Sequence, residues 1–254
     1  MFWIEFLEHD NVVNFILLFF RMAALFITLH IFSHEGIPIT VKAALALFFT
    51  IFFYPEVPPL ILNVDIATLA LAALSEFLFG LFIGMVLQIA FHAITFAGGQ
   101  ISFNMGFSMA SAIDPQTGVS MPIISQFLSL IALMVLFSLD MHHWILLFSS
   151  SSIANIPLGG FMTTQNMFDY TLVASANMFV VGFMIAFPIT ALSLLADIIF
   201  GMLMKTMPQF NLLVIGFPIK IAVAFLVLMA TLASTMYILS NNMQEAFNFL
   251  EMLF

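Results

Sequence analysis

The sequence has little charge and no cysteine, and each absence excludes a class of protein. Charged residues make up 7% of the 254 residues, against about 25% in a typical soluble domain. With so few charges the chain cannot cover a water-exposed surface with polar groups, so a water-soluble enzyme is excluded. The lack of cysteine excludes disulfides, thiol catalysis and cysteine-based zinc or iron–sulfur sites.

Basic residues are especially scarce. The chain has four of them and a formal net charge of −9. Nucleic-acid binding depends on Lys and Arg side chains that neutralise phosphates. We therefore expect no nucleic acid among the partners of this chain.

Long hydrophobic runs fill most of the sequence, of which 63% is hydrophobic. Between Phe77 and Ile113 there is no Asp, Glu, Lys or Arg. The runs are continuous, whereas strands of a membrane β-barrel alternate apolar and polar residues. A helix satisfies its own backbone hydrogen bonds in lipid. The sequence therefore predicts an all-α membrane protein of about six long, partly kinked helices arranged as hairpins.

The six predicted helical segments are separated by Gly, Pro and Asp signals, which include Gly98-Gly99 and Asp114-Pro115. The third and fifth segments have 31 and 33 residues, which is too long for a simple span of a hydrocarbon core of about 30 Å. Pro188 lies inside the fifth segment and predicts a kink there. The segments are Val12–Ser33, Ile39–Tyr54, Ile66–Phe96, Met121–Leu139, Leu172–Met204 and Leu212–Ser240.

Small residues recur every fourth position in the central segment, at Gly98, Ser102, Gly106 and Ala110. On a helix they share one face, where another backbone can approach closely. One interpretation is a helix-packing seam followed by a loop. The other is a polar or mobile element that lines a conduit, since irregular backbone at membrane depth is tolerated where protein or a cavity surrounds it. Both remain open at this point.

Three charges are singled out as candidate intramembrane charges: Arg21 and Asp197 lie inside hydrophobic segments, and Lys205 directly follows the fifth. A charge in the bilayer costs several kcal/mol, so it pairs, reaches the interface or faces a cavity. Asp197 and Lys205 lie eight residues apart on similar helix faces, and we expect either to be the counterpart of Arg21 or an interfacial anchor.

The cluster from Asp140 to His143 invites a metal interpretation. Adjacent histidines do not easily share a helix face, and the cluster precedes Trp144, as in an interfacial belt. We therefore predict no metal site there. Since the chain also has no nucleotide-binding loop or catalytic triad, we predict no cofactor and no enzymatic activity.

Two blocks of sequence carry a resemblance to a known family. The first runs from Gly99-Gln100 through Met105-Gly106 to Asp114-Pro115. The second is the signature region Lys205, Pro208, Gln209, Asn211, Gly216, Phe217 and Pro218. Together they resemble the FliR family of flagellar type III export-gate membrane proteins. The sequence departs from many members in having Lys205 where they have Arg, which puts a bidentate ion pair at that position in doubt.

The resemblance implies a subunit of the export channel through which unfolded rod, hook and filament subunits pass. It implies FliP and FliQ as partners in a hetero-oligomeric gate, with FlhB and FlhA alongside. The location implied is the bacterial inner membrane at the flagellar basal body, with much of the assembly on the periplasmic side.

The resemblance also implies how the chain is organised. Residues 1–254 would form one membrane-embedded domain, with a FliP-like part over about 1–170 and a FliQ-like part over about 171–254. A plug-like loop would close the pore. Its residues are Gly106, Phe107, Ser108, Met109, Ala110, Asp114, Pro115, Gly118 and Met121.

Two further hypotheses remain beside flagellar export. Injectisome export proteins share much of the same pattern. A small-molecule or ion transporter is the other hypothesis, although such proteins usually show inverted repeats around a polar site at the membrane midplane, and no convincing repeat is present here.

Overall fold

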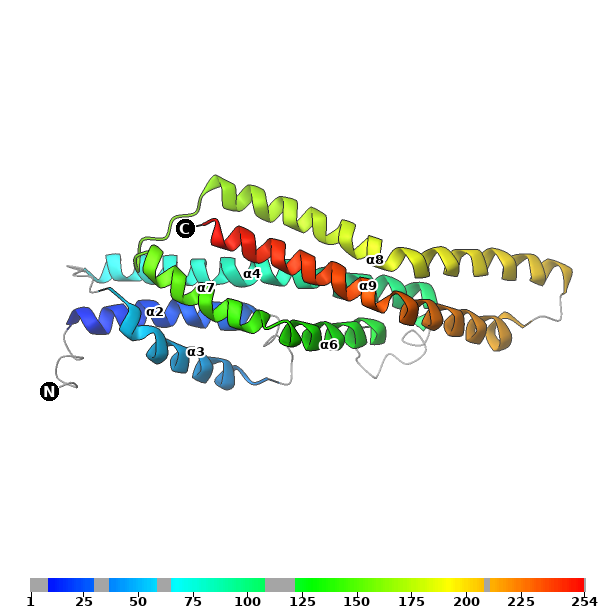
Figure 1. Cartoon of the computed structure of the whole chain (residues 1–254), viewed down its shortest axis with the longest axis horizontal. Coiled ribbons are helices and arrows are strands. Elements are labelled where there is room, and N and C mark those ends of the chain that lie inside the picture. The colour runs from blue at the N-terminus through cyan, green and yellow to red at the C-terminus, as the bar shows by residue number, and fades with distance from the viewer. Residues whose placement is uncertain (1–8, 30–36, 59–64, 108–121, 208–210, 254) are drawn as a thin grey trace. The chain divides into compact units, whose positions relative to one another are not determined.

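A computed structural model describes residues 9–29, 37–58, 65–107, 122–207 and 211–253, and over these residues the chain is helical without strands (Figure 1). A short 3-10 helix η2 (Tyr54–Glu56) follows α3, and a π-helical turn η4 (Leu212–Gly216) precedes α9. The prediction of an all-α protein is confirmed. The α-helices are α2 (His9–Thr28), α3 (Ile39–Phe53), α4 (Ile66–Met105), α6 (Ile123–Ser138), α7 (Met141–Asn155), α8 (Gln165–Thr206) and α9 (Phe217–Glu251).

Five of the described helical stretches are long and apolar enough to cross a membrane, namely those formed by α2, α3, α4, α8 and α9. The pair α6 and α7 gives a sixth if it is one broken span. The six predicted hydrophobic segments therefore correspond to helices. The structure adds α7 as a helix of its own, since Leu139 and Asp140 form a turn between α6 and α7.

Two helices are longer than the sequence predicted. α4 has 40 residues and α8 has 42, or about 60 Å and 63 Å at 1.5 Å per residue.

The predicted break at Gly98-Gly99 is wrong, because α4 continues through both glycines to Met105. Gly98 is needed for close packing instead of a turn, since it lies against the backbone of Ser125. Pro188 lies inside α8, which is helical on both sides of it; the kink stays a prediction.

The chain forms two compact units. The first comprises the described residues of Met1–Ala90, Asp140–Ala174 and Met243–Phe254, and the second those of Phe91–Leu139 and Ser175–Asn242. Helices α4, α8 and α9 contribute residues to both. These units follow contacts within the chain, and differ from the predicted FliP-like and FliQ-like division near residue 170, which stays a prediction.

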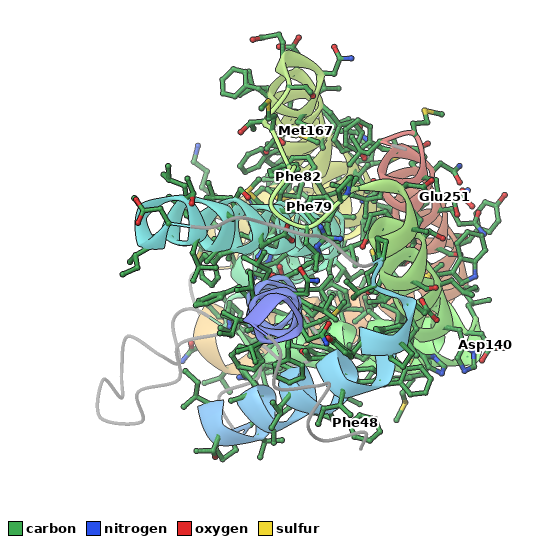
Figure 2. The ribbon with its side chains drawn as sticks, turned by 90° about the vertical axis from the view of Figure 1, so that its left-hand side faces the viewer. Phe48, Phe79, Phe82, Asp140, Met167 and Glu251 are labelled. Atoms are coloured by element: carbon green, nitrogen blue, oxygen red, sulfur yellow. The ribbon has the colours of Figure 1, made fainter. Side chains whose placement is uncertain are left out.

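In the first unit, aromatic side chains pack the helices together. α2 packs on α3, where the rings of Phe26 and Phe49 stack with centroids 5.1 Å apart. Phe79 of α4 is fully buried, 4.8 Å from the ring of Phe161. Figure 2 shows Phe79 and Phe82 among the interior side chains, whereas Phe48 lies at the edge and is exposed.

In the second unit, α4 contacts both α6 and α8. The hydroxyl of Ser125 in α6 donates to the carbonyl of Thr95 in α4 at 2.5 Å. On the α8 side, the ring of Phe96 makes edge contacts with the rings of Phe179 and Phe183. The amide of Asn104 donates to the hydroxyl of Thr190 at 2.9 Å. The C-terminal part of α4, from Thr95 to Asn104, is therefore held by both α6 and α8.

Candidate functional site

A buried ion pair joins α2 to α4 in the first unit. Nε of Arg21 donates to Oε2 of Glu76 at 2.5 Å, and NH2 of Arg21 donates to Oε1 at 3.1 Å. Their side chains are 1% and 0% exposed, so both charges are removed from solvent. The planar guanidinium matches the carboxylate with two parallel hydrogen bonds, which is the strong arrangement for such a pair.

Further groups complete this site from α7 and the segment that follows it. NH1 of Arg21 donates to the carbonyl oxygen of Ser152 at 3.0 Å and to its hydroxyl at 3.3 Å, and NH2 donates to the carbonyl of Ile156 at 3.2 Å. The backbone N–H of Gly159 donates to Oε1 of Glu76 at 2.7 Å. We call these residues the arginine network. It links α2, α4 and α7 through polar groups that satisfy one another.

The counterpart predicted for Arg21 was wrong. Neither Asp197 nor Lys205 pairs with it; Glu76 does. Glu76 is the single charged residue within the predicted segment Ile66–Phe96. A lone carboxylate inside an apolar helix is itself the signal of a buried partner, so this signal was present in the sequence.

Asp197 instead pairs with Lys220 in the second unit. Nζ of Lys220, in α9, donates to both carboxylate oxygens of Asp197, in α8, at 2.7 and 2.8 Å. The lysine side chain is 9% exposed and the aspartate 55%. The pair therefore joins α8 to α9 with one end buried and the other open.

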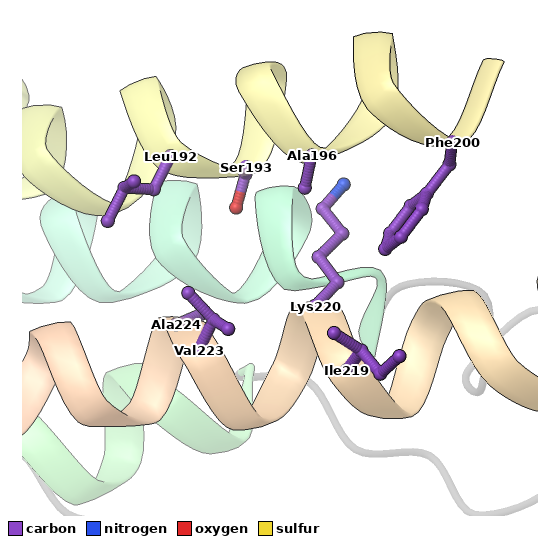
Figure 3. A pocket seen from close by; sticks show the side chains of 8 residues that line it. All are labelled: Leu192, Ser193, Ala196, Phe200, Ile219, Lys220, Val223 and Ala224. Carbon is purple, nitrogen blue, oxygen red and sulfur yellow. The ribbon is translucent and has the colours of Figure 1, made fainter. Parts of the chain in front are cut away.

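A small cavity of about 40 Å³ adjoins Lys220 between α8 and α9 (Figure 3). Figure 3 shows the lysine side chain rising from α9 toward α8 beside Ala196, with Ser193 on the same side of α8. The Ser193 hydroxyl is buried without a hydrogen-bond partner. The volume suffices for about one water molecule, so the surroundings of Lys220 are not completely filled by side chains.

Lys205, the third charge singled out in the sequence, lies exposed in the last turn of α8. A cation there is favoured by the carbonyl groups at the helix end.

The predicted seam of small residues is described as far as Gly106. At Gly98 a side-chain Cβ would lie 2.5 Å from Cα of Ser125, so α4 and α6 approach there as closely as glycine allows. Ser102, one turn later, is buried. Gly106 differs from the prediction of one continuous helical face, because α4 ends at Met105 and Gly106 has φ +88°. Ala110 lies outside the described residues.

Most of the predicted plug loop also lies outside the described residues, namely Ser108, Met109, Ala110, Asp114, Pro115, Gly118 and Met121. Its first residue is described and meets the signature region. A Cβ at Gly106 would lie 2.7 Å from Cε1 of Phe217. The structure therefore brings together two motifs that lie more than a hundred residues apart in the sequence.

The other signature residues surround the start of α9. The carbonyl oxygen of Asn211 accepts the N–H of Ile215 at 3.0 Å, and its side-chain oxygen accepts that of Val214 at 3.4 Å. Gly216 is the last residue of η4, and Phe217 and Pro218 open α9. Proline fits the first turn of a helix because no partner is needed there for its missing N–H. Pro208 and Gln209 lie outside the described residues.

Comparison with known proteins identifies the family of this chain. The family model "Bacterial export proteins, family 1" matches residues 12–246. The chain belongs to this family. Among its relatives, the flagellar biosynthetic protein FliR of Bacillus subtilis is 32% identical over 236 residues, covering 91% of each chain. FliR of Escherichia coli is 29% identical over 230 residues, covering 91% of this chain and 88% of the relative.

A more distant relative, FliR of Aquifex aeolicus, is 25% identical over 250 residues and covers 96% of this chain and 95% of its own. The resemblance to the FliR family that the two motifs indicated is therefore confirmed over nearly the whole length. In this bacterial export protein, both buried cations are held by carboxylates, and the groups described above hold helices in place.

Proposed function

We propose that this chain is a structural and gating subunit of the flagellar type III export channel in the bacterial inner membrane, without catalytic activity. It would help to form the conduit for unfolded rod, hook and filament subunits. The observation that carries the proposal is the family match over residues 12–246, together with FliR relatives that align over most of their length.

The exposed apolar surface of the long helices supports a multi-subunit assembly. In α2, 50% of the most apolar stretch of the helix is buried within the chain. The corresponding share is only 28% in α8 and 22% in α9. α8 is also about twice as long as the hydrocarbon core is thick. Apolar surface outside the core needs cover, and we propose FliP and FliQ as the neighbouring subunits, with FlhB and FlhA alongside and much of the assembly on the periplasmic side.

The gating part of the proposal concerns Gly106 to Met121. The positive φ of Gly106 turns the chain out of α4, and Phe217 lies against this glycine. A loop anchored at the end of a helix that α6 and α8 both hold has a fixed starting point, which a plug requires.

Co-expression tests the assembly. The chain is produced with its organism's FliP and FliQ, one of them tagged, and complexes are isolated and weighed by native mass spectrometry. We expect a defined complex containing all three, and poor accumulation of the chain without FliP. A stable, monodisperse chain that binds neither partner would contradict the proposal and favour the transporter hypothesis.

Deletion of residues 108–121 tests the gate. We expect cells with the assembled deletion complex to leak ions or small solutes, and co-purification with FliP serves as the assembly control. Unchanged permeability in an assembled deletion complex would leave this chain a structural subunit without a plug.

A further inference from the structure

We propose that Asp140, His142 and His143, at the start of α7, form a binding site for a divalent transition-metal ion such as Zn²⁺. One ligand atom from each of the three side chains lies within 4.8 Å of the others. Zinc sites are tetrahedral with bonds of about 2.1 Å, so two ligand atoms lie about 3.4 Å apart. The three ligand atoms therefore have to approach one another by at most about 1.4 Å to bind one ion, which rotation of the side chains allows.

The backbone at Asp140 directs its carboxylate into the cluster. Asp140 has φ 56° and is the one non-glycine residue with positive φ in the described part of the chain. It occupies the N-cap position of α7, where an aspartate ordinarily accepts a backbone N–H, yet its side chain makes no capping hydrogen bond. Instead, Oδ1 lies 3.5 Å from Nδ1 of His143. The carboxylate thus faces an imidazole in place of the helix end.

The two imidazoles lie together although the residues are adjacent. Their ring centroids are 4.1 Å apart, with the planes tilted by 39°. The sequence-based objection, that neighbouring histidines diverge on a helix, does not hold here because both lie in the first turn of α7, directly after a turn. The side chains of Asp140 and His143 are 70% and 61% exposed, and Figure 2 shows Asp140 at the edge of the molecule. The described part of the chain therefore leaves the cluster uncovered.

The donor set selects the class of ion. Imidazole nitrogens bind Zn²⁺, Ni²⁺ and Cu²⁺ in preference to Mg²⁺ and Ca²⁺, which take oxygen ligands. Two neutral imidazoles and one carboxylate carry a charge of −1, which suits a divalent ion. Three protein ligands leave a coordination position for water, as in open zinc sites.

The probe for this site is Co²⁺, whose visible absorption changes when nitrogen ligands bind it. The full-length chain, carrying a tag free of histidine, is placed in lipid nanodiscs and titrated with Co²⁺, and Zn²⁺ is then added as a competitor. We expect one Co²⁺ per chain, displaced by Zn²⁺. The double variant His142→Gln/His143→Gln should weaken binding at least tenfold, and Asp140→Asn should weaken it less.

A matched control uses two other histidines that lie close in the sequence, His30 and His34. The variant His30→Gln/His34→Gln should bind Co²⁺ as the unmodified chain does. Far-ultraviolet circular dichroism checks that each variant remains helical. Two results would overturn the proposal: no Co²⁺ binding by the helical unmodified chain, or binding that survives in the helical His142→Gln/His143→Gln variant. The first would leave the cluster as an interfacial polar belt beside Trp144.

Discussion

The two units hold their buried cations differently. In the first, the guanidinium of Arg21 donates to a carboxylate, two backbone carbonyls and a hydroxyl. In the second, Lys220 donates to one carboxylate, whose side chain is about half exposed. Groups from α2, α4, α7 and the segment after α7 thus satisfy the first pair, while the second pair keeps its carboxylate end open. The two ion pairs should therefore respond differently to substitution.

The largest expected effect comes from Glu76→Leu. It leaves the Arg21 guanidinium buried without its carboxylate, which costs about 3–5 kcal/mol of unfolding free energy. Unfolding by sodium dodecyl sulfate in mixed micelles, followed by circular dichroism on the full-length chain, measures the loss.

The double variant Arg21→Met/Glu76→Leu is the control for that change. Replacing both charges with apolar groups of similar volume is often nearly neutral, so most of the stability should return. If the double variant is as unstable as Glu76→Leu, the single-variant effect reflects poor packing and the arginine network is not its cause.

Close helix packing gives the next largest effect, and two adjacent glycines provide a matched pair. Gly98→Ala forces α4 away from the backbone of Ser125, and overpacking of this kind costs about 1–3 kcal/mol. At Gly99 the nearest atom is the Ser125 hydroxyl oxygen at 3.8 Å. Gly99→Ala should therefore stabilise α4 by up to about 1 kcal/mol through helix propensity. The same detergent unfolding compares them, and equal effects would contradict the assigned contact.

A smaller effect is expected in the second unit for Asp197→Asn. The carboxylate is 55% exposed, whereas that of Glu76 is fully buried, and a pair with one open end contributes less than a fully buried one. The cavity beside Lys220 also leaves room for the ammonium to find water. The unfolding midpoint should shift far less than for Glu76→Leu. A shift of equal size would mean that both units hold their charges with the same rigidity.

Ser152→Ala sets the lower end of the comparison. It removes the hydroxyl 3.3 Å from NH1 of Arg21 but keeps the carbonyl oxygen at 3.0 Å. The expected loss is about 0.5–1.5 kcal/mol, the value of one hydrogen bond. A loss as large as that of Glu76→Leu would show that the hydroxyl, and not the carboxylate, organises the network.

The helices were predictable because continuous apolar runs are a strong local signal. Hydrophobicity located the segments from Val12 to Ser240, and the two blocks of motifs indicated the family. The break at Gly98-Gly99 failed because a glycine that serves packing looks the same in sequence as one that ends a helix. Only the position of Ser125 in space distinguishes the two cases.

The candidate site was predicted less well, because its contacts join distant residues. Arg21 and Asp197 were recognised as charges that need partners, but spacing along the chain does not say that Glu76 and Lys220 supply them. These partners lie 55 and 23 residues away, so helix periodicity carries no information about them. For the same reason the sequence singled out Gly106 and Phe217 separately without placing them together.

The order in which a ribosome makes the arginine network has a consequence for membrane insertion. Glu76 follows Arg21 by 55 residues and Ser152 follows it by 131. At about 5–20 residues per second these groups emerge roughly 3–11 s and 7–26 s after Arg21. During that interval the guanidinium has none of these partners. If it enters the bilayer centre, inserting the charge costs about 2.5–3.5 kcal/mol of free energy. The leucines and phenylalanines of α2 must hold the nascent helix in place until the rest of the chain arrives.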